Sequence, residues 1–128
     1  KTHPWVEILE GPASEAQYFA WFQKTDILLL PYISPKYACS TSGVFVEALY
    51  FLTPIVTTKD TWMAHKIGEA RSAGLNIGEV VEHFSEIGAA VDRITANMAT
   101  YRADMQQYLT QWKAFHNAET LVKMLVEQ

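Results

Sequence analysis

The chain has 128 residues, of which 49% are hydrophobic and 19% are charged, so it can bury the core of one folded domain and is not a disordered chain. Its net charge of −4, with no basic cluster to offset it, argues against a nucleic-acid partner. The single cysteine excludes an internal disulfide bond and suits a reducing compartment, so we expect a cytoplasmic protein. No apolar run is long enough to predict a membrane span.

The first two-thirds of the chain predict strands that alternate with helices. Ser14 and Gln17 have the spacing of a capping box, which predicts the start of a helix. Four consecutive aliphatic residues at 27–30 suit a strand that is covered on both faces, as in a parallel sheet. In chain order we expect a strand at 5–9, a helix from 14 to about 24, a strand at 27–30, a helix at 42–52, a strand at 54–58, a helix at 63–72 and an extended segment at 75–81.

The last third predicts helices only, because its apolar residues recur at helical spacing. Ser85 is a candidate N-cap for the first of these helices, and residues 101–115 carry a second apolar stripe. Asn117 is a candidate N-cap for a third helix. The apolar residues expected on the inside of that helix are Leu121, Val122 and Leu125.

These elements predict one domain over residues 1–128 of the α/β class: a partial Rossmann-like parallel sheet with flanking helices and a helical C-terminal tail. The expected parallel strands are 6–9, 27–30 and 55–58. Because the first residue is lysine and not methionine, we expect the chain to be part of a longer protein.

The stretch that follows the strand at 27–30 is the strongest candidate for a binding site. A polar loop ends in small residues that open a very apolar helix, and one carboxylate, Glu47, lies a turn inside it. Free N–H groups and the dipole at a helix start favour an anion, and a carboxylate beyond it can bind hydroxyl groups. Phosphate plus ribose is a ligand that suits this pair. The alternatives are an exposed surface Glu47 and an ordinary N-cap at Ser42.

Other chemistry-bearing residues give weaker signals. Trp62 follows the next strand, where it either lines the same cleft or packs on the loop. The four histidines share no metal-ligand spacing, and Cys39 has no histidine near it to activate a thiolate. The chain has neither a P-loop nor a Gly-x-Gly-x-x-Gly motif. We therefore expect no metal and no cofactor, and we name no catalytic residue.

Three segments resemble the C-terminal domain of retaining glycosyltransferases of the GT-B fold, the group 1 sugar transferases. They are Asp-Ile-Leu-Leu-Leu-Pro at 26–31, Ser-Gly-Val-Phe-Val-Glu-Ala-Leu at 42–49 and Thr-Pro-Ile-Val at 53–56. The resemblance extends over about residues 5–115, and its motif core is 26–58. The family's usual glycine before the proline of the third segment is replaced here by Leu52.

The resemblance implies roles for individual residues. Glu47 matches the second glutamate of the family's Glu-x7-Glu motif, which binds the ribose of a nucleotide-sugar, whereas the first glutamate is replaced by Cys39. Cys39 and Ser40 then belong to the loop that faces the donor sugar. The remaining donor-nucleotide residues implied by the resemblance are Thr41, Ser42, Gly43 and Val44 at the phosphate and Gly11, Pro12 and Ala13 at the base.

The function that the resemblance implies is transfer of a hexose from a UDP- or GDP-sugar to a hydroxyl acceptor. In that family the acceptor site and a catalytic histidine lie in a separate N-terminal domain, so we expect this chain alone to be inactive. We also expect self-association through an exposed sheet edge. The base, sugar, acceptor and linkage are not specified by these residues.

Two other functions stay open. One is a non-catalytic α/β module that binds a partner, such as a receiver-like domain, since Thr57, Thr58 and Lys59 end a strand as in receivers. However, the strand at 27–30 ends in Pro31 rather than in an aspartate that could be phosphorylated. The other is a sugar-nucleotide epimerase of related fold.

Overall fold

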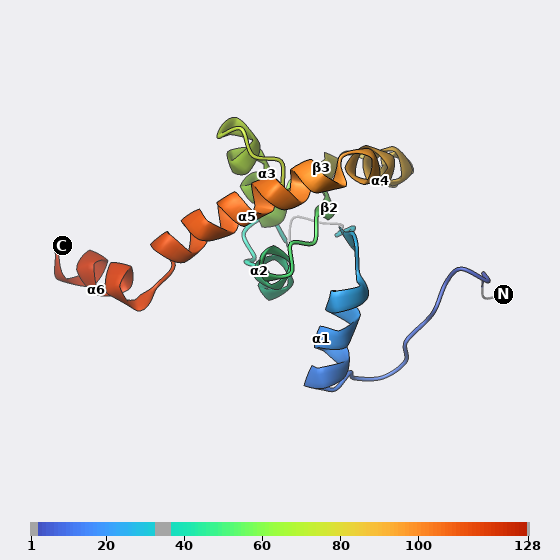
Figure 1. The fold of residues 1–128 in the computed structure, drawn as a ribbon, viewed down its shortest axis with the longest axis horizontal. Coiled ribbons are helices and arrows are strands. Elements are labelled where there is room, and N and C mark those ends of the chain that lie inside the picture. Colours follow the sequence, from blue (N-terminus) through green and yellow to red (C-terminus); the bar gives the residue numbers. More distant parts are fainter. Residues whose placement is uncertain (1–2, 33–36, 128) are drawn as a thin grey trace.

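The computed structural model describes residues 3–32 and 37–127. Its elements alternate first and then become helical (Figure 1). In chain order they are α1 (Glu15–Lys24), β1 (Leu28–Leu30), α2 (Gly43–Tyr50), β2 (Ile55–Thr58), α3 (Trp62–Ser72), β3 (Gly78–Val81), the 3-10 turn η2 (Phe84–Glu86), α4 (Ile87–Ala96), α5 (Met98–Phe115) and α6 (Ala118–Val126).

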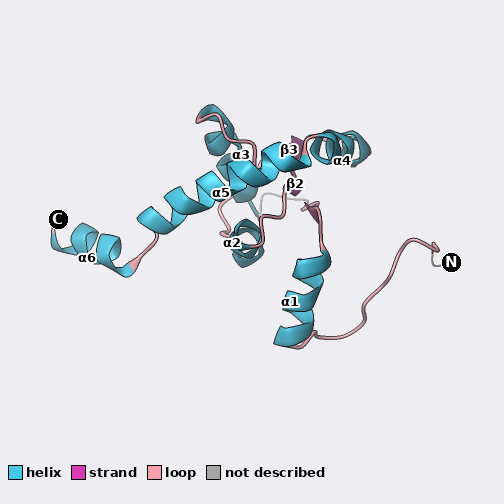
Figure 2. Ribbon diagram, viewed as in Figure 1, coloured by secondary structure: helices cyan, strands magenta, loops and turns pink. Residues whose placement is uncertain are grey.

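The described strands form one parallel sheet in the order β1-β2-β3. Leu29 lies opposite Val56, which lies opposite Glu79, so the central strand β2 is paired on both sides. The connecting helices α2 and α3 pack on one face of the sheet, and α4 packs against β2 and β3 from the other face. Figure 2 shows the strands in magenta among the helices in cyan. The fold is therefore α/β, as expected, with a partial Rossmann-like sheet and flanking helices.

Two apolar clusters fill the two sides of this sheet. The larger one joins β1 and β2 to α2, α3 and α5, and Phe45, Leu49 and Met105 within it are fully buried. The smaller one joins β2 and β3 to α4 and the first turns of α5, with Ala90 and Ile94 fully buried. Because α5 contributes to both clusters, it connects the two helical layers.

The expected strand at 6–9 is wrong. Residues 5–9 are irregular in the structure, and Trp5 and Ile8 are 87% and 66% exposed. Residues 5–9 do not pair with β1, the edge strand of the described sheet, so the segment gains no hydrogen bonds between strands. An apolar run becomes a strand only when a partner is available, because a single extended segment leaves its backbone groups to water. The extended segment at 75–81, in contrast, does contain a strand, β3.

Most of the predicted helix starts are confirmed. Ser14 and Gln17 form a reciprocal capping box at α1, and the Asn117 side chain accepts from the N–H of Thr120 at α6. Ser85, in contrast, is no cap, because it lies inside η2 and α4 begins at Ile87. The Glu86 carboxylate accepts from the backbone N–H groups of residues 82 and 83, which precede η2, and α4 itself has no side-chain cap among the described residues.

The end of α2 has, at Leu52, a backbone conformation that usually favours glycine. The Thr53 N–H donates to the carbonyl of Ala48, and the Leu52 N–H donates to that of Leu49, which is the pattern of a Schellman motif. Leu52 has φ +52°, in the left-handed region that glycine adopts without strain. The backbone therefore keeps the geometry of a glycine stop although the residue is leucine.

The expected burial of the last helix is also wrong. Leu121, Val122 and Leu125 are 58%, 58% and 64% exposed, and no described residue of α6 is buried. Figure 1 shows α6 at the C-terminal end, beyond the part of α5 that packs on the sheet. The helix itself forms where the sequence predicts it, but its apolar face has no covering element in the described chain.

Candidate functional site

The candidate site lies at the carboxyl end of β1, where ligands bind in open α/β sheets. The loop from β1 to α2 is described at Pro31 and Tyr32 and again from Tyr37 onward, and residues 33–36 lie outside the described residues. The rings of Tyr32 and Tyr37 stack with centroids 4.3 Å apart, which brings the two described ends of the loop together. Cys39, Ser40 and Thr41 are exposed on the second part of this loop.

The start of α2 has the geometry of an anion site. Ser42 is extended, and its Oγ accepts from the N–H of Phe45 at 3.1 Å. The N–H groups of Gly43 and Val44 precede the first hydrogen bond within the helix, so α2 itself offers them no acceptor. A Cβ added at Gly43 would meet nothing within 4 Å, so the space beside this residue is open.

Glu47 is half-buried on α2, and its carboxylate has a partner inside the protein. The hydroxyl of Tyr18, on α1, donates a hydrogen bond to Oε2 of Glu47. Burial, followed by the hydrogen bond to Glu47 and its negative charge, raises the pKa of Tyr18 to about 12. The carboxylate is therefore neither a free surface group nor dependent on a ligand for its first hydrogen bond.

Tyr18 is a site residue that sequence reasoning missed. Its spacing with Phe19 and Phe22 indicated only an apolar side of α1. The hydroxyl of Tyr18 could have indicated a polar contact, since a buried tyrosine hydroxyl usually has a hydrogen-bond partner. Nothing in the sequence identified that partner, because Tyr18 and Glu47 are 29 positions apart.

The turn expected at the nucleotide base lies apart from this pair. Gly11, Pro12 and Ala13 are exposed, and Gly11 has φ +80°, which suits glycine. Figure 1 shows this turn at the end of α1 that is remote from β1. Among the described residues, no hydrogen bond or ion pair joins it to α2. The structure thus brings together Tyr18, Glu47 and the start of α2, but not residues 11–13.

Threonine side chains fix the strand ends beneath the site. The Thr57 hydroxyl donates to the Leu30 carbonyl at 3.0 Å, and the Thr58 hydroxyl donates to the carbonyl of Tyr32. Thr61 caps α3 by accepting from Ala64 at 3.0 Å. These bonds tie the carboxyl end of β1 to β2, so the loop toward α2 leaves the sheet from a rigid base.

Trp62 packs in the core and does not line a cleft. Its ring meets Phe45 edge-to-face at 5.2 Å and Trp112 of α5 at 6.5 Å. Trp62 thus packs against α2 and α5, and not on the loop as one of the two interpretations had it. The contacts also place α3, α2 and α5 against one another behind the candidate site.

A second tyrosine–carboxylate pair lies on the opposite face of the sheet. Tyr101 of α5 donates to Glu79 Oε1 at 2.5 Å. Arg71 and Arg93 reach the same carboxylate at 3.3 and 3.6 Å, and Arg71 also donates to the carbonyl of Gly78 at 3.0 Å. Burial, followed by the bond to Glu79, raises the pKa of Tyr101 to about 12. Each polar side chain of this cluster binds another of its members, so the cluster is a structural network.

The described residues contain no group of three or more histidine, cysteine, aspartate or glutamate side chains that could hold a metal ion. His65 pairs with Glu69 at 3.1 Å, and His116 stacks on Trp112 at 4.0 Å. Within the same residues, no helix is long and apolar enough to cross a membrane.

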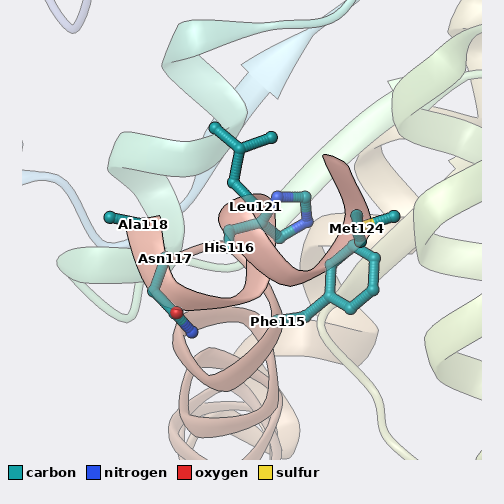
Figure 3. Close-up of a pocket in the computed structure, with 6 residues that line it drawn as sticks. All are labelled: Phe115, His116, Asn117, Ala118, Leu121 and Met124. Atoms are coloured by element: carbon teal, nitrogen blue, oxygen red, sulfur yellow. The ribbon is translucent and has the colours of Figure 1, made fainter. Parts of the chain in front are cut away.

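A pocket lies elsewhere, at the turn between α5 and α6 (Figure 3). None of the residues that the sequence proposes for ligand binding lines it, so it is separate from the site at α2. The lining residues are Phe115, His116, Asn117, Ala118, Leu121 and Met124.

Comparison of the chain with protein-family models, with curated proteins and with solved structures gives no match. The resemblance to glycosyltransferases therefore rests on the sequence motifs of this chain alone.

Proposed function

We propose that this chain is the donor-binding part of a GT-B glycosyltransferase that transfers a sugar from a UDP- or GDP-sugar to a hydroxyl acceptor. One observation carries the proposal: Glu47 stands one turn behind an open, Ser42-capped helix start at the carboxyl end of a parallel strand. The left-handed backbone at Leu52 supports it too, because the resembled family usually has glycine at that position.

The spacing along α2 suits a nucleotide. Residues four apart lie on the same face of a helix, about 6 Å apart along its axis, so Glu47 and Gly43 share a face. The Cα–Cβ bond of Glu47 also tilts toward the helix start. A phosphate held by the amides of Gly43 and Val44 would therefore leave the hydroxyls of its own ribose near the carboxylate.

These groups would act on the leaving diphosphate and on orientation. Amides at a helix start that point at a diphosphate stabilise the negative charge that grows on it as the bond to the sugar breaks. Hydrogen bonds from the ribose to Glu47 would hold the donor in one pose. We propose that Cys39 and Ser40 face the donor sugar and that Gly11, Pro12 and Ala13 contact the base. The free Cys39 suits a reducing compartment, so we place the enzyme in the cytoplasm.

The test is a calorimetric titration of the full-length protein with UDP and with GDP, before and after Glu47→Gln. A charged hydrogen bond contributes roughly 1.5–3 kcal/mol, so we expect an affinity loss of about tenfold to a hundredfold. Glu119→Gln is the matched control, since it removes the same charge from the exposed face of α6. Thermal melts show whether each variant folds.

Two results would overturn the proposal. One is a wild-type protein that binds neither nucleotide. The other is an unchanged affinity in folded Glu47→Gln, which would leave Glu47 as a partner of Tyr18 alone.

A further inference from the structure

Tyr18 is held in place more firmly than a surface tyrosine. Its ring meets Phe22 edge-to-face at 5.3 Å, and Phe22 is buried and stacks on Phe51 at 5.2 Å. Phe51 directly follows α2. The ring of Tyr18 is thus connected through two aromatic contacts to the same helix that carries Glu47, so its hydroxyl has little freedom to move relative to the carboxylate.

The hydrogen bond leaves Glu47 with capacity for a ligand. A carboxylate has two oxygens and about four acceptor positions. Tyr18 occupies one position on Oε2, so Oε1 and the remaining positions are available to hydroxyl donors. Because the pKa of Tyr18 is raised to about 12, its hydroxyl stays protonated at neutral pH and remains a donor.

An unrestrained glutamate on a helix samples several rotamers, and ordering it on binding would weaken the affinity. The bond from Tyr18 orders the side chain before any ligand arrives. A restrained carboxylate one turn from an anion site is the arrangement that favours a ligand with hydroxyls at a fixed distance from its phosphate.

We propose that Tyr18 is a positioning residue of the nucleotide site, which holds Glu47 in the orientation that receives the 2′- and 3′-hydroxyls of the ribose. This inference rests on the proposed function. It assigns α1 a part in recognition of the ligand, in addition to its aromatic contacts with Phe51 at the end of α2.

The experiment compares two ligands in each variant of the full-length protein. The nucleoside diphosphate that binds wild type is titrated beside its 2′,3′-dideoxy analogue, and the ratio of the two affinities measures recognition of the ribose hydroxyls. In Tyr18→Phe the ratio should fall by about threefold to tenfold, the equivalent of about one ordinary hydrogen bond. The affinity for the dideoxy analogue should not change.

Tyr101→Phe is the matched control. It deletes the same kind of tyrosine–carboxylate hydrogen bond, but on the opposite face of the sheet. It should lower the melting temperature and leave the ratio at its wild-type value. A change in the ratio in Tyr18→Phe alone therefore separates positioning of Glu47 from a general loss of stability.

The outcomes are distinguishable from those of the proposed function. If Glu47→Gln lowers the ratio and Tyr18→Phe only lowers the melting temperature, Tyr18 is structural and the inference fails while the function stands. If neither variant changes the ratio, the ribose assignment itself fails. Should Tyr18→Phe not fold, Tyr18→His replaces it: a ratio below wild type supports the inference, because the shorter imidazole does not reach the position of the tyrosine hydroxyl, and a wild-type ratio in the folded variant overturns it.

Discussion

Replacing Gly78 by alanine puts a methyl group where β3 passes closest to β2. A Cβ built on Gly78 lies inside 3.0 Å of the carbonyl oxygen of Ile55, a separation that real Cβ atoms essentially never show, and 3.1 Å from Cδ1 of Ile67. Both neighbours are at most 1% exposed, so neither can move into solvent. Overpacking usually costs about 1–3 kcal/mol, and here the nearest atom is backbone, so we expect a loss of about 3 kcal/mol or more.

The assay is unfolding in denaturant followed by circular dichroism, with two other glycines as controls. Gly68→Ala in α3 has open space around the new methyl and should stabilise the domain by about 0.5–1 kcal/mol. Gly74→Ala also has space, but its φ of +83° should make it cost about 1 kcal/mol. A Gly78→Ala protein whose free energy of unfolding lies within about 1 kcal/mol of the wild-type value would refute the parallel register of β3 on β2.

Two further predictions concern alkaline stability and the last helix. The pKa of Tyr101 is raised to about 12 in the folded protein, so the unfolded chain loses this proton first as the pH rises. The contribution of Tyr101 to the free energy of unfolding is therefore complete below about pH 10 and falls by roughly 1.4 kcal/mol per pH unit up to about pH 12. Denaturant midpoints between about pH 9 and 11.5 should fall less steeply in Tyr101→Phe, and equal slopes would contradict this. A chain that ends at Asn117 should have a free energy of unfolding within about 0.5 kcal/mol of the wild-type value, since no described residue of α6 is buried. A loss above about 2 kcal/mol would show that α6 packs on the domain in solution.

The features that were predictable from the sequence are the ones that local chemistry decides. The caps at Ser14, Ser42 and Asn117 follow from a side-chain oxygen that reaches an N–H three residues on, and the structure has all three bonds. The strand β1 follows from a run of aliphatic residues, but its expected cover on both faces is wrong, because Leu29 is 45% exposed in this edge strand of the described sheet. Each of these predictions depends on a short window of residues.

Two of the wrong predictions, the strand at residues 5–9 and the burial of α6, have a cause that is not local. Residues 5–9 and α6 both have apolar patterns, and both are exposed in the structure. An apolar pattern indicates that a segment has an apolar side. It does not predict which element covers that side, because burial depends on elements far away in the sequence. The Ser85 cap failed for a local reason, since the 3-10 turn η2 runs directly into α4 and leaves Ser85 inside helical structure.

The bond between Tyr18 and Glu47 changes how the candidate site should be judged. From the sequence, Glu47 was either a ligand-binding carboxylate or an exposed surface group, and the structure shows a half-buried carboxylate whose burial the tyrosine hydroxyl already offsets in part. The remaining argument for a ligand is the arrangement of charges along α2, with a positive helix start and a negative carboxylate one turn further on. The helix start attracts an anion, whereas Glu47 repels one about a turn away, so a bare phosphate is favoured by the first group and opposed by the second. A neutral sugar can use the carboxylate but gains nothing from the free amides. A ligand that carries its negative charge at one end and hydroxyl donors a few ångströms away satisfies both groups together, and a nucleoside diphosphate has that distribution.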